Sequence, residues 1–137
     1  MIRPICKDIF LLAMKSAPAS AEDLGTAQDL LDTVSAHSHE CVGMAANMIG
    51  VHKRIIVFQD DMRYTVMLNP VIKWASPNTF ETQEGCLSLT GTRPVTRHES
   101  IEVDYLDMNM KKQRRRYSGF SAQIIQHECD HLDGVLI

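Results

Sequence analysis

Residues 127–131, which read His-Glu-Cys-Asp-His, carry the clearest chemical signal in the chain. Histidines four positions apart lie on one face of a helix, so the imidazoles of His127 and His131 can bind one metal ion. Glu128 lies beside that pair, where its carboxylate can take a proton from a water on the metal. The alternative is a surface helix with two chance histidines. The apolar residues 124–125 argue against it, because they would bury the helix and buried histidines need polar partners.

A third metal ligand is expected upstream of this motif. Zinc proteases with the same motif take their third ligand downstream, but only six residues follow His131, and Asp133 is the sole candidate among them. Cys86 is the best upstream candidate, since Gly85 lets the backbone pass close to the site. Cys41 is the second candidate. One thiolate and two imidazoles leave a fourth position for water or substrate, which is typical of a catalytic metal site.

Three segments together resemble the signature motifs of the peptide deformylases. They read Gly-Met-Ala-Ala at 43–46, Glu-Gly-Cys-Leu-Ser at 84–88 and Gln-His-Glu-Cys-Asp-His at 126–131. The resemblance covers nearly the whole chain and implies an α+β fold, with antiparallel β-sheets packed around the helix that bears the HExxH motif. It also implies a divalent metal, commonly Fe²⁺ and replaceable by Ni²⁺, Co²⁺ or Zn²⁺. The implied reaction removes the formyl group from N-formylmethionyl peptides of newly made proteins.

The same resemblance assigns roles to single residues. It makes Cys86, His127 and His131 the metal ligands and Glu128 the general acid and base. The backbone N–H of Leu87 would donate to the oxyanion that develops at the formyl carbon. Helical spacing adds that two apolar residues, three and seven positions before His127, share its face and can form walls of the methionine pocket. The expected substrate-binding residues are Val42, Gly43, Gly85, Phe120 and Ile124.

The first motif departs from the family pattern at Met48, where the family has a glutamine whose amide helps to hold the oxyanion. Methionine has no N–H, and losing one such donor typically costs about 100- to 1000-fold in rate. The neighbouring Asn47 points in a different direction. Met48 therefore predicts a reduced efficiency of deformylation, and restoring glutamine should raise the activity.

Two other functions compete with this reading. The first is a metal-binding paralogue that acts on a different acyl group, or that no longer catalyses and binds peptide N-termini; Met48 favours it. The second is a zinc protease, which the missing downstream ligand and the Gly-Cys-Leu-Ser segment disfavour.

The elements that must position these residues can be placed from periodicity. A helix over 20–38 begins at a capping box of Ser20 and Asp23, and residues 43–50 are expected to form a loop that leads into a short extended segment. A buried strand over 55–58 pairs with 64–68 across a turn at 60–61, and Asn69-Pro70 ends the second strand. Residues 101–105 alternate as a half-solvated strand, and a helix over 118–131 stops at Gly134. Strands in one block between helices indicate α+β.

Length and composition limit the remaining possibilities. At 137 residues, with 45% hydrophobic and 23% charged residues, the chain is expected to form a single globular domain over 1–137. A net charge of −3 gives no reason to expect DNA, and no apolar run is long enough for a membrane span. Four cysteines without a signal peptide favour the cytoplasm.

Three further side chains and one basic segment have an expected role outside the ligand set. Glu84, next to the metal loop, is expected to orient a ligand rather than to catalyse. Arg93 and Arg97 are expected to pair with Glu84 or Glu99 rather than to anchor a carboxylate of the substrate. The basic run at 111–116 is expected to be a solvated turn and edge strand. The chain ends shortly after the last motif, where many deformylases continue, so only a transient ribosome contact is expected.

Overall fold

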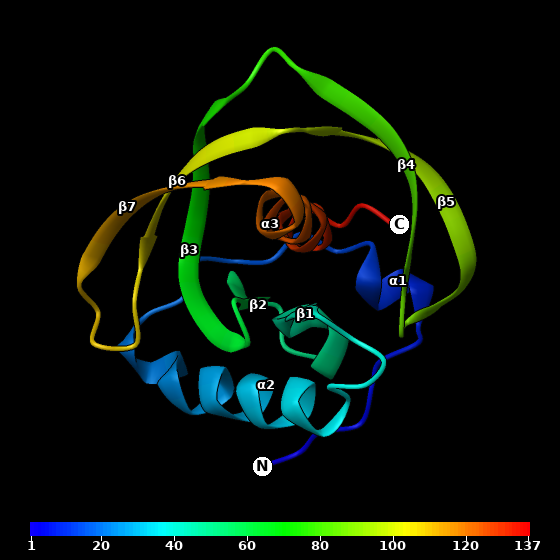
Figure 1. The fold of residues 1–137 in the computed structure, drawn as a ribbon. Coiled ribbons are helices and arrows are strands. Elements are labelled where there is room, and N and C mark those ends of the chain that lie inside the picture. The colour runs from blue at the N-terminus through cyan, green and yellow to red at the C-terminus, as the bar shows by residue number, and fades with distance from the viewer.

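The structure is a computed structural model that describes residues 1–137. Five strands form one antiparallel sheet in the order β1-β2-β3-β6-β7, and two more form the β4-β5 hairpin. In Figure 1, helix α3 is seen almost end-on, with strands on several sides of it. The elements are α1 (Ile9–Leu12), the 3₁₀ turn η1 (Ala21–Asp23), α2 (Leu24–Ala36), β1 (Gly43–Ala45), the 3₁₀ turn η2 (Ala46–Ile49), β2 (Ile55–Asp60), β3 (Arg63–Ala75), β4 (Thr79–Cys86), β5 (Leu89–His98), β6 (Ser100–Leu106), β7 (Lys112–Ser118) and α3 (Gly119–Leu132).

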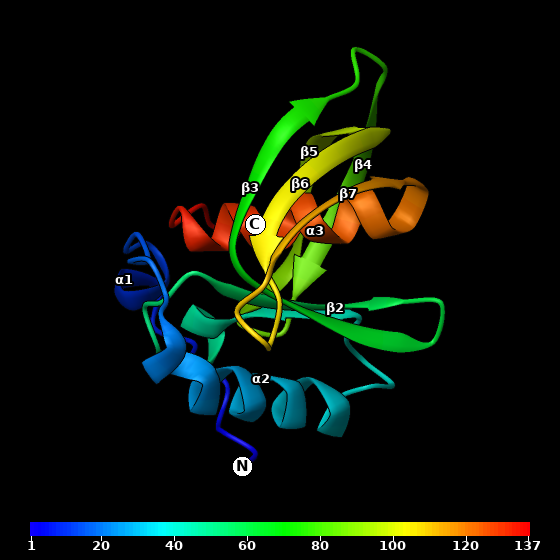
Figure 2. The same cartoon turned by 90° about the vertical axis from the view of Figure 1, so that its left-hand side faces the viewer.

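Strand β2 separates two apolar cores because successive side chains point to opposite faces of a sheet. Ile55 and Val57 pack in the core that also holds buried residues of α2. Ile56 and Phe58 pack in the other core, with the apolar residues of α3. Figure 2 shows α2 below this strand and α3 above it. The predicted buried strand is therefore buried on both faces, and the predicted α+β arrangement around the HExxH helix is confirmed.

The second strand of the predicted hairpin is much longer than its apolar pattern indicated. The tight turn falls at Asp61 and Met62, which both have positive φ, rather than at 60–61. Asn69 and Pro70 do not end the strand, because the pairing with β6 shifts register between Leu68 and Val71 and the strand continues. A bulge accommodates a proline that has no N–H to donate. The side chain of Asn69 also bonds both ways to the backbone of Ala19.

Other predicted elements differ at their ends or in kind. The capping box of Ser20 and Asp23 is present, but it caps η1, and the α-helix begins only at Leu24. Residues 43–50 are not a loop: they form β1, which pairs with β2, followed by η2. The hairpin β4-β5 was not predicted, because its sequence is mostly polar and lacks clear alternation. The basic run lies on β7, which is an edge strand of the sheet, as expected.

Candidate metal centre and substrate pocket

Helix α3 holds the HExxH motif inside the protein. It begins after Ser118 and ends at Leu132, and Gly134 follows with φ +78°. Its apolar residues pack against β2 and the long strands, so the polar residues of the motif are carried into the interior. His127, Glu128 and His131 are exposed by only 8%, 4% and 2%. Buried groups of this kind need partners or a metal ion.

The two histidines face each other as ligands of one ion would. Nε2 of His127 lies 3.0 Å from Nε2 of His131. Two nitrogens on one tetrahedral zinc ion, at the usual bond length, would lie about 3.3 Å apart. The ligand atoms of His127, Glu128 and His131 all lie within 4.8 Å of one another. The residue types and spacing therefore fit a divalent metal between the imidazoles.

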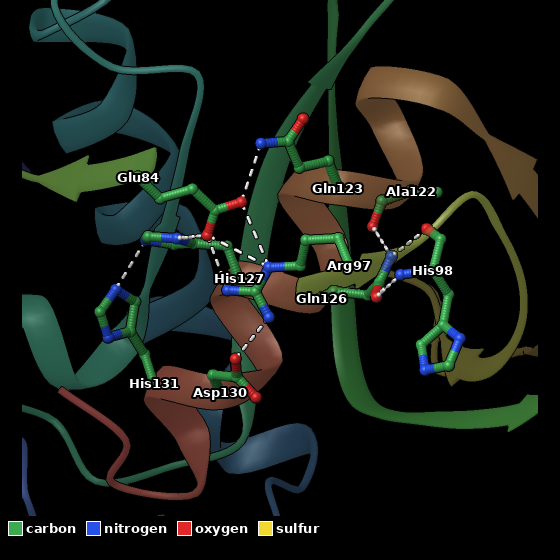
Figure 3. Close-up of polar contacts among 9 residues, drawn as sticks. All are labelled: Glu84, Arg97, His98, Ala122, Gln123, Gln126, His127, Asp130 and His131. Carbon is green, nitrogen blue, oxygen red and sulfur yellow. Dashed lines mark hydrogen bonds and ion pairs between the residues drawn. The ribbon is translucent and has the colours of Figure 1, made fainter. Parts of the chain in front are cut away.

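Glu84 at the end of β4 orients one of these rings, as the sequence indicated. Its Oε1 lies 2.8 Å from Nδ1 of His127, so the opposite nitrogen is directed toward His131 (Figure 3). Burial opposes the ionised form, but hydrogen bonds from His127, Arg97 and Gln123 outweigh it and lower the pKa of Glu84 to about 2. Its carboxylate is therefore charged and accepts hydrogen bonds only.

Arg97 completes this buried network. Its guanidinium donates to both oxygens of Glu84, at 2.6 Å to Oε1 and 3.2 Å to Oε2, and at 2.6 Å to Asp130 on α3. The predicted pairing of Arg97 with Glu84 is present, and Asp130 is a second, unexpected partner. Arg93 forms no such ion pair and donates to the carbonyl of Thr90 instead. Asp130 lies three positions after His127 on the same face of α3, but that spacing does not select Arg97 as its partner. The network ties the β4-β5 hairpin to the metal-binding helix.

The two imidazoles titrate differently in the metal-free protein. Burial opposes the charged form of His127, but hydrogen bonding to Cys86 and Glu84 outweighs it and raises its pKa to about 10. Burial and the charge of His127 lower the pKa of His131 to about 3. A protonated His127 can donate from Nε2 to a neutral His131, across the 3.0 Å that separates the two nitrogens. A bound cation would replace the shared proton.

Glu128 lies beside this pair with an oxygen that has no partner. Its Oε1 is buried and makes no hydrogen bond. Its Oε2 lies against the backbone of β1 at Gly43. A Cβ atom added to Gly43 would lie 2.9 Å from this oxygen and 2.6 Å from the side chain of Ile124. Burial raises the pKa of Glu128 to about 7. A carboxyl group with a pKa near neutrality is suited to both accepting and donating a proton.

A pocket of about 220 Å³ opens directly onto these groups. Four of the five expected substrate-binding residues line it; the fifth, Gly43, lies behind Ile124 and Glu128 instead. Two lining residues, Gln83 and Gln123, were not expected from the sequence. Gln123 could have been found by helical spacing, since it lies four positions before His127. The lining consists of Val42, Gln83, Glu84, Gly85, Phe120, Gln123, Ile124, His127 and Glu128.

The remaining predicted residues lie around the same centre. Cys86 is outside the tight cluster of three ligand atoms, but it lies near enough to His127 to contribute to the raised pKa of that ring. Leu87 follows it in the turn between β4 and β5. The thiol of Cys41 donates to the carbonyl of Gly43 at 2.7 Å, and burial raises its pKa to about 11. A thiol held protonated in this way is a poor metal ligand.

Met48 is buried, with 1% of its surface exposed, and belongs to the apolar core against which Cys86 and Leu87 pack. Its side chain therefore lies in the core next to the metal loop and offers no N–H there. The amide of Asn47 donates to the carbonyl of His131 at 2.8 Å, so it faces the end of α3 rather than the pocket. No amide from this segment thus replaces the family's glutamine.

An HExxH helix enclosed by antiparallel strands, with a buried carboxyl group beside two facing imidazoles, is the arrangement of a metal-dependent hydrolase. A family model described as polypeptide deformylase matches residues 9–137. A peptide deformylase from Clostridium beijerinckii is 51% identical over 138 residues and is covered completely, as is this chain. One from a Picosynechococcus species is 38% identical, over 90% of this chain and 68% of its own length.

Solved structures agree with these relatives. The class I type b peptide deformylase from Acinetobacter baumannii, bound to Met-Ala-Ser, superposes with a TM-score of 0.90 at 31% identity, covering 99% of this chain and 97% of that chain. The enzyme from Thermotoga maritima gives 0.90 at 26% identity, covering 99% and 95%. This chain belongs to the peptide deformylase family. It is thus a metallo-amidohydrolase that removes the N-formyl group from nascent peptides, and the predicted family, fold and reaction are confirmed.

Proposed function

We propose that the residues around the facing imidazoles carry out this deformylation, with N-formylmethionyl peptides as substrate. The observation that carries the proposal is a pocket lined by both His127 and Glu128, beside two facing imidazoles and a buried carboxyl oxygen that has no hydrogen-bond partner. A relative bound to Met-Ala-Ser, a peptide that begins with methionine, supports this choice of substrate. The apolar residues Val42, Phe120 and Ile124 would contact the methionine side chain.

The proposed metal ligands are His127, His131 and Cys86. The two facing nitrogens and the nearby thiol of Cys86 form a donor set that suits Fe²⁺, Ni²⁺, Co²⁺ or Zn²⁺, and the family resemblance favours Fe²⁺. When bound, the ion supplies a Lewis acid that activates water and polarises the formyl carbonyl. Glu84 holds the ring of His127 in the tautomer that leaves Nε2 free for the ion.

The chain's own groups would then move the proton and hold the developing charge. Glu128 accepts the proton of the attacking water at its carboxylate and delivers it to the nitrogen of the departing peptide. The backbone N–H of Leu87 donates to the formyl oxygen as it becomes negative. The backbone at Gly85, and that near Gly43, would contact the peptide. The C–N bond breaks, and the products are formate and a peptide with a free amino group.

Three expectations about the wider role are part of the proposal. Residues 1–137 would act as one domain, which is supported by the contact of α3 with β1, β2, β5, β6 and β7. The enzyme would act in the cytoplasm; no helix of the structure is long and apolar enough to span a membrane. A ribosome contact would be transient.

The ligand assignment can be tested by two cysteine variants. Cys86→Ser should lose most of the bound metal and of the formate released from formyl-Met-Ala-Ser, whereas Cys41→Ser should keep both. Metal content and formate are measured on the same samples, purified without oxygen because a thiolate ligand is oxidisable. Equal losses in the two variants, or cleavage of internal peptide bonds in place of formate release, would contradict the proposal.

A further inference from the structure

The pocket beside the metal centre has a polar wall that a methionine side chain does not require. Val42, Phe120 and Ile124 form its apolar side. The lining also includes the polar residues Gln83 on β4 and Gln123 on α3. Methionine offers only a weakly accepting sulfur, so it leaves such groups without good hydrogen bonds.

The orientation of the Gln123 carboxamide follows from its neighbour. Nε2 of Gln123 donates to Oε2 of Glu84 at 2.8 Å, so the nitrogen of the carboxamide faces Glu84. Figure 3 shows the carboxamide oxygen directed away from Glu84. The second N–H and this oxygen make no hydrogen bond within the protein and are available at the pocket wall.

Gln83 differs from Gln123 in its setting. It is exposed on the hairpin, and its oxygen accepts only a long contact, of 3.5 Å, from Thr92. A hydrogen bond that it makes to a ligand competes with water, whereas Gln123 is half-buried and fixed by Glu84. Gln123 is therefore the residue of this wall that can discriminate between ligands.

We propose that Gln123 determines the specificity of the pocket, extending it to unbranched N-terminal side chains that end in a hydrogen-bond acceptor. Methionine sulfoxide is the matching chemical class, because its stem fits the apolar side and its oxygen can accept the free N–H of Gln123. This inference rests on the proposed function, since it assumes that the first side chain of a formyl peptide occupies the pocket. The enzyme then deformylates peptides that begin with oxidised methionine as well as those that begin with methionine.

The test compares two formyl tripeptides, X-Ala-Ser, in which X is methionine sulfoxide or norleucine. Norleucine has the length of methionine without any acceptor. Gln123→Met removes the amide at nearly constant length, and Gln83→Met is the matched control on the same wall. The readout is the ratio of kcat/KM for the sulfoxide peptide to that for the norleucine peptide. Loss of the contact to Glu84 affects both peptides equally, so it cancels in this ratio.

We expect Gln123→Met to lower the ratio about tenfold and Gln83→Met to change it less than about twofold, because the hydrogen bond from half-buried Gln123 competes less with water than one from exposed Gln83. The deformylated tripeptides provide a readout without catalysis: calorimetry should show the same tenfold change in the ratio of their dissociation constants. An unchanged ratio in Gln123→Met, or a larger change in Gln83→Met, would overturn the assignment. Absence of formate from both peptides, together with a changed binding ratio, would refute the proposed reaction and leave the role of Gln123 standing.

Discussion

Replacing Glu84 with glutamine changes the charge of the side chain that orients His127 and hardly alters its shape. All its neighbours are donors: His127, Arg97 and Gln123 all direct N–H groups at the two carboxylate oxygens. The carboxamide of the Glu84→Gln variant would direct its NH₂ group at one or more of these three donors. Because the amide of Gln123 can turn round to accept, the NH₂ group of the variant should face that side, and the remaining oxygen should stay near His127.

The size of the effect follows from what the variant still keeps. The ring of His127 loses a charged acceptor but retains a neutral one, and loss of such an orienting group typically lowers metal affinity about 10- to 100-fold. Arg97 is exposed by only 5% and keeps Asp130 as its single charged partner. Breaking a buried ion pair lowers the free energy of unfolding by about 3–5 kcal/mol. Because Arg97 keeps its ion pair with Asp130, we expect a loss near the lower value. For a chain of this length that corresponds to a fall in Tm of about 10 °C.

Metal affinity is measured by competition with a chelator, and Tm by circular dichroism, on the wild type and Glu84→Gln. Glu81→Gln is the matched control, since Glu81 is exposed on the same strand and makes no ion pair. The control should match the wild type in both measurements. If Glu84→Gln retained wild-type metal affinity, the orienting role of Glu84 would be refuted, even if the Tm fell.

Three further changes test other parts of the site. Burial raises the pKa of Glu128 from 4.5 to about 7, so this group should make the metal-free protein less stable as the pH rises from 4.5 through 7. The change in Tm between pH 5 and pH 8 should therefore shift toward higher stability at pH 8 in Glu128→Gln, in which only the other groups titrate; an identical change in the two proteins would contradict the raised pKa. Met48→Gln should raise formate release, up to about 100-fold, while lowering Tm because it buries an amide; no gain would count against the oxyanion explanation. Gly43→Ala should reduce both Tm and formate release, because the added carbon would lie 2.6 Å from Ile124. Gly25→Ala, in an open position on α2, should not reduce either.

Residues whose chemistry depends on local spacing were predictable from the sequence. The positions of His127, Glu128 and His131 on one helix follow from 3.6 residues per turn, and the pocket-lining position of Ile124 follows from the same rule. The buried strand β2 was predictable because four consecutive apolar residues bury both faces.

The features that the sequence did not disclose depend on contacts between distant segments. The hairpin β4-β5 is mostly polar, and its role in carrying Glu84 and Arg97 to α3 appears only when the chain has folded. Strand β3 passes beyond Pro70 because a bulge in its pairing with β6 removes the need for an N–H there. The second partner of Arg97, Asp130, lies 33 positions away, and no local pattern selects it.

The central claim is that Glu128 and its neighbouring metal centre remove the formyl group. The most direct measurement is formate release from formyl-Met-Ala-Ser by the wild type and by Glu128→Ala, both loaded with Fe²⁺ or Ni²⁺ without oxygen and analysed for metal content. The account predicts formate from the wild type and almost none from a Glu128→Ala protein that holds the same amount of metal. Equal formate release from the two metal-replete proteins would contradict it.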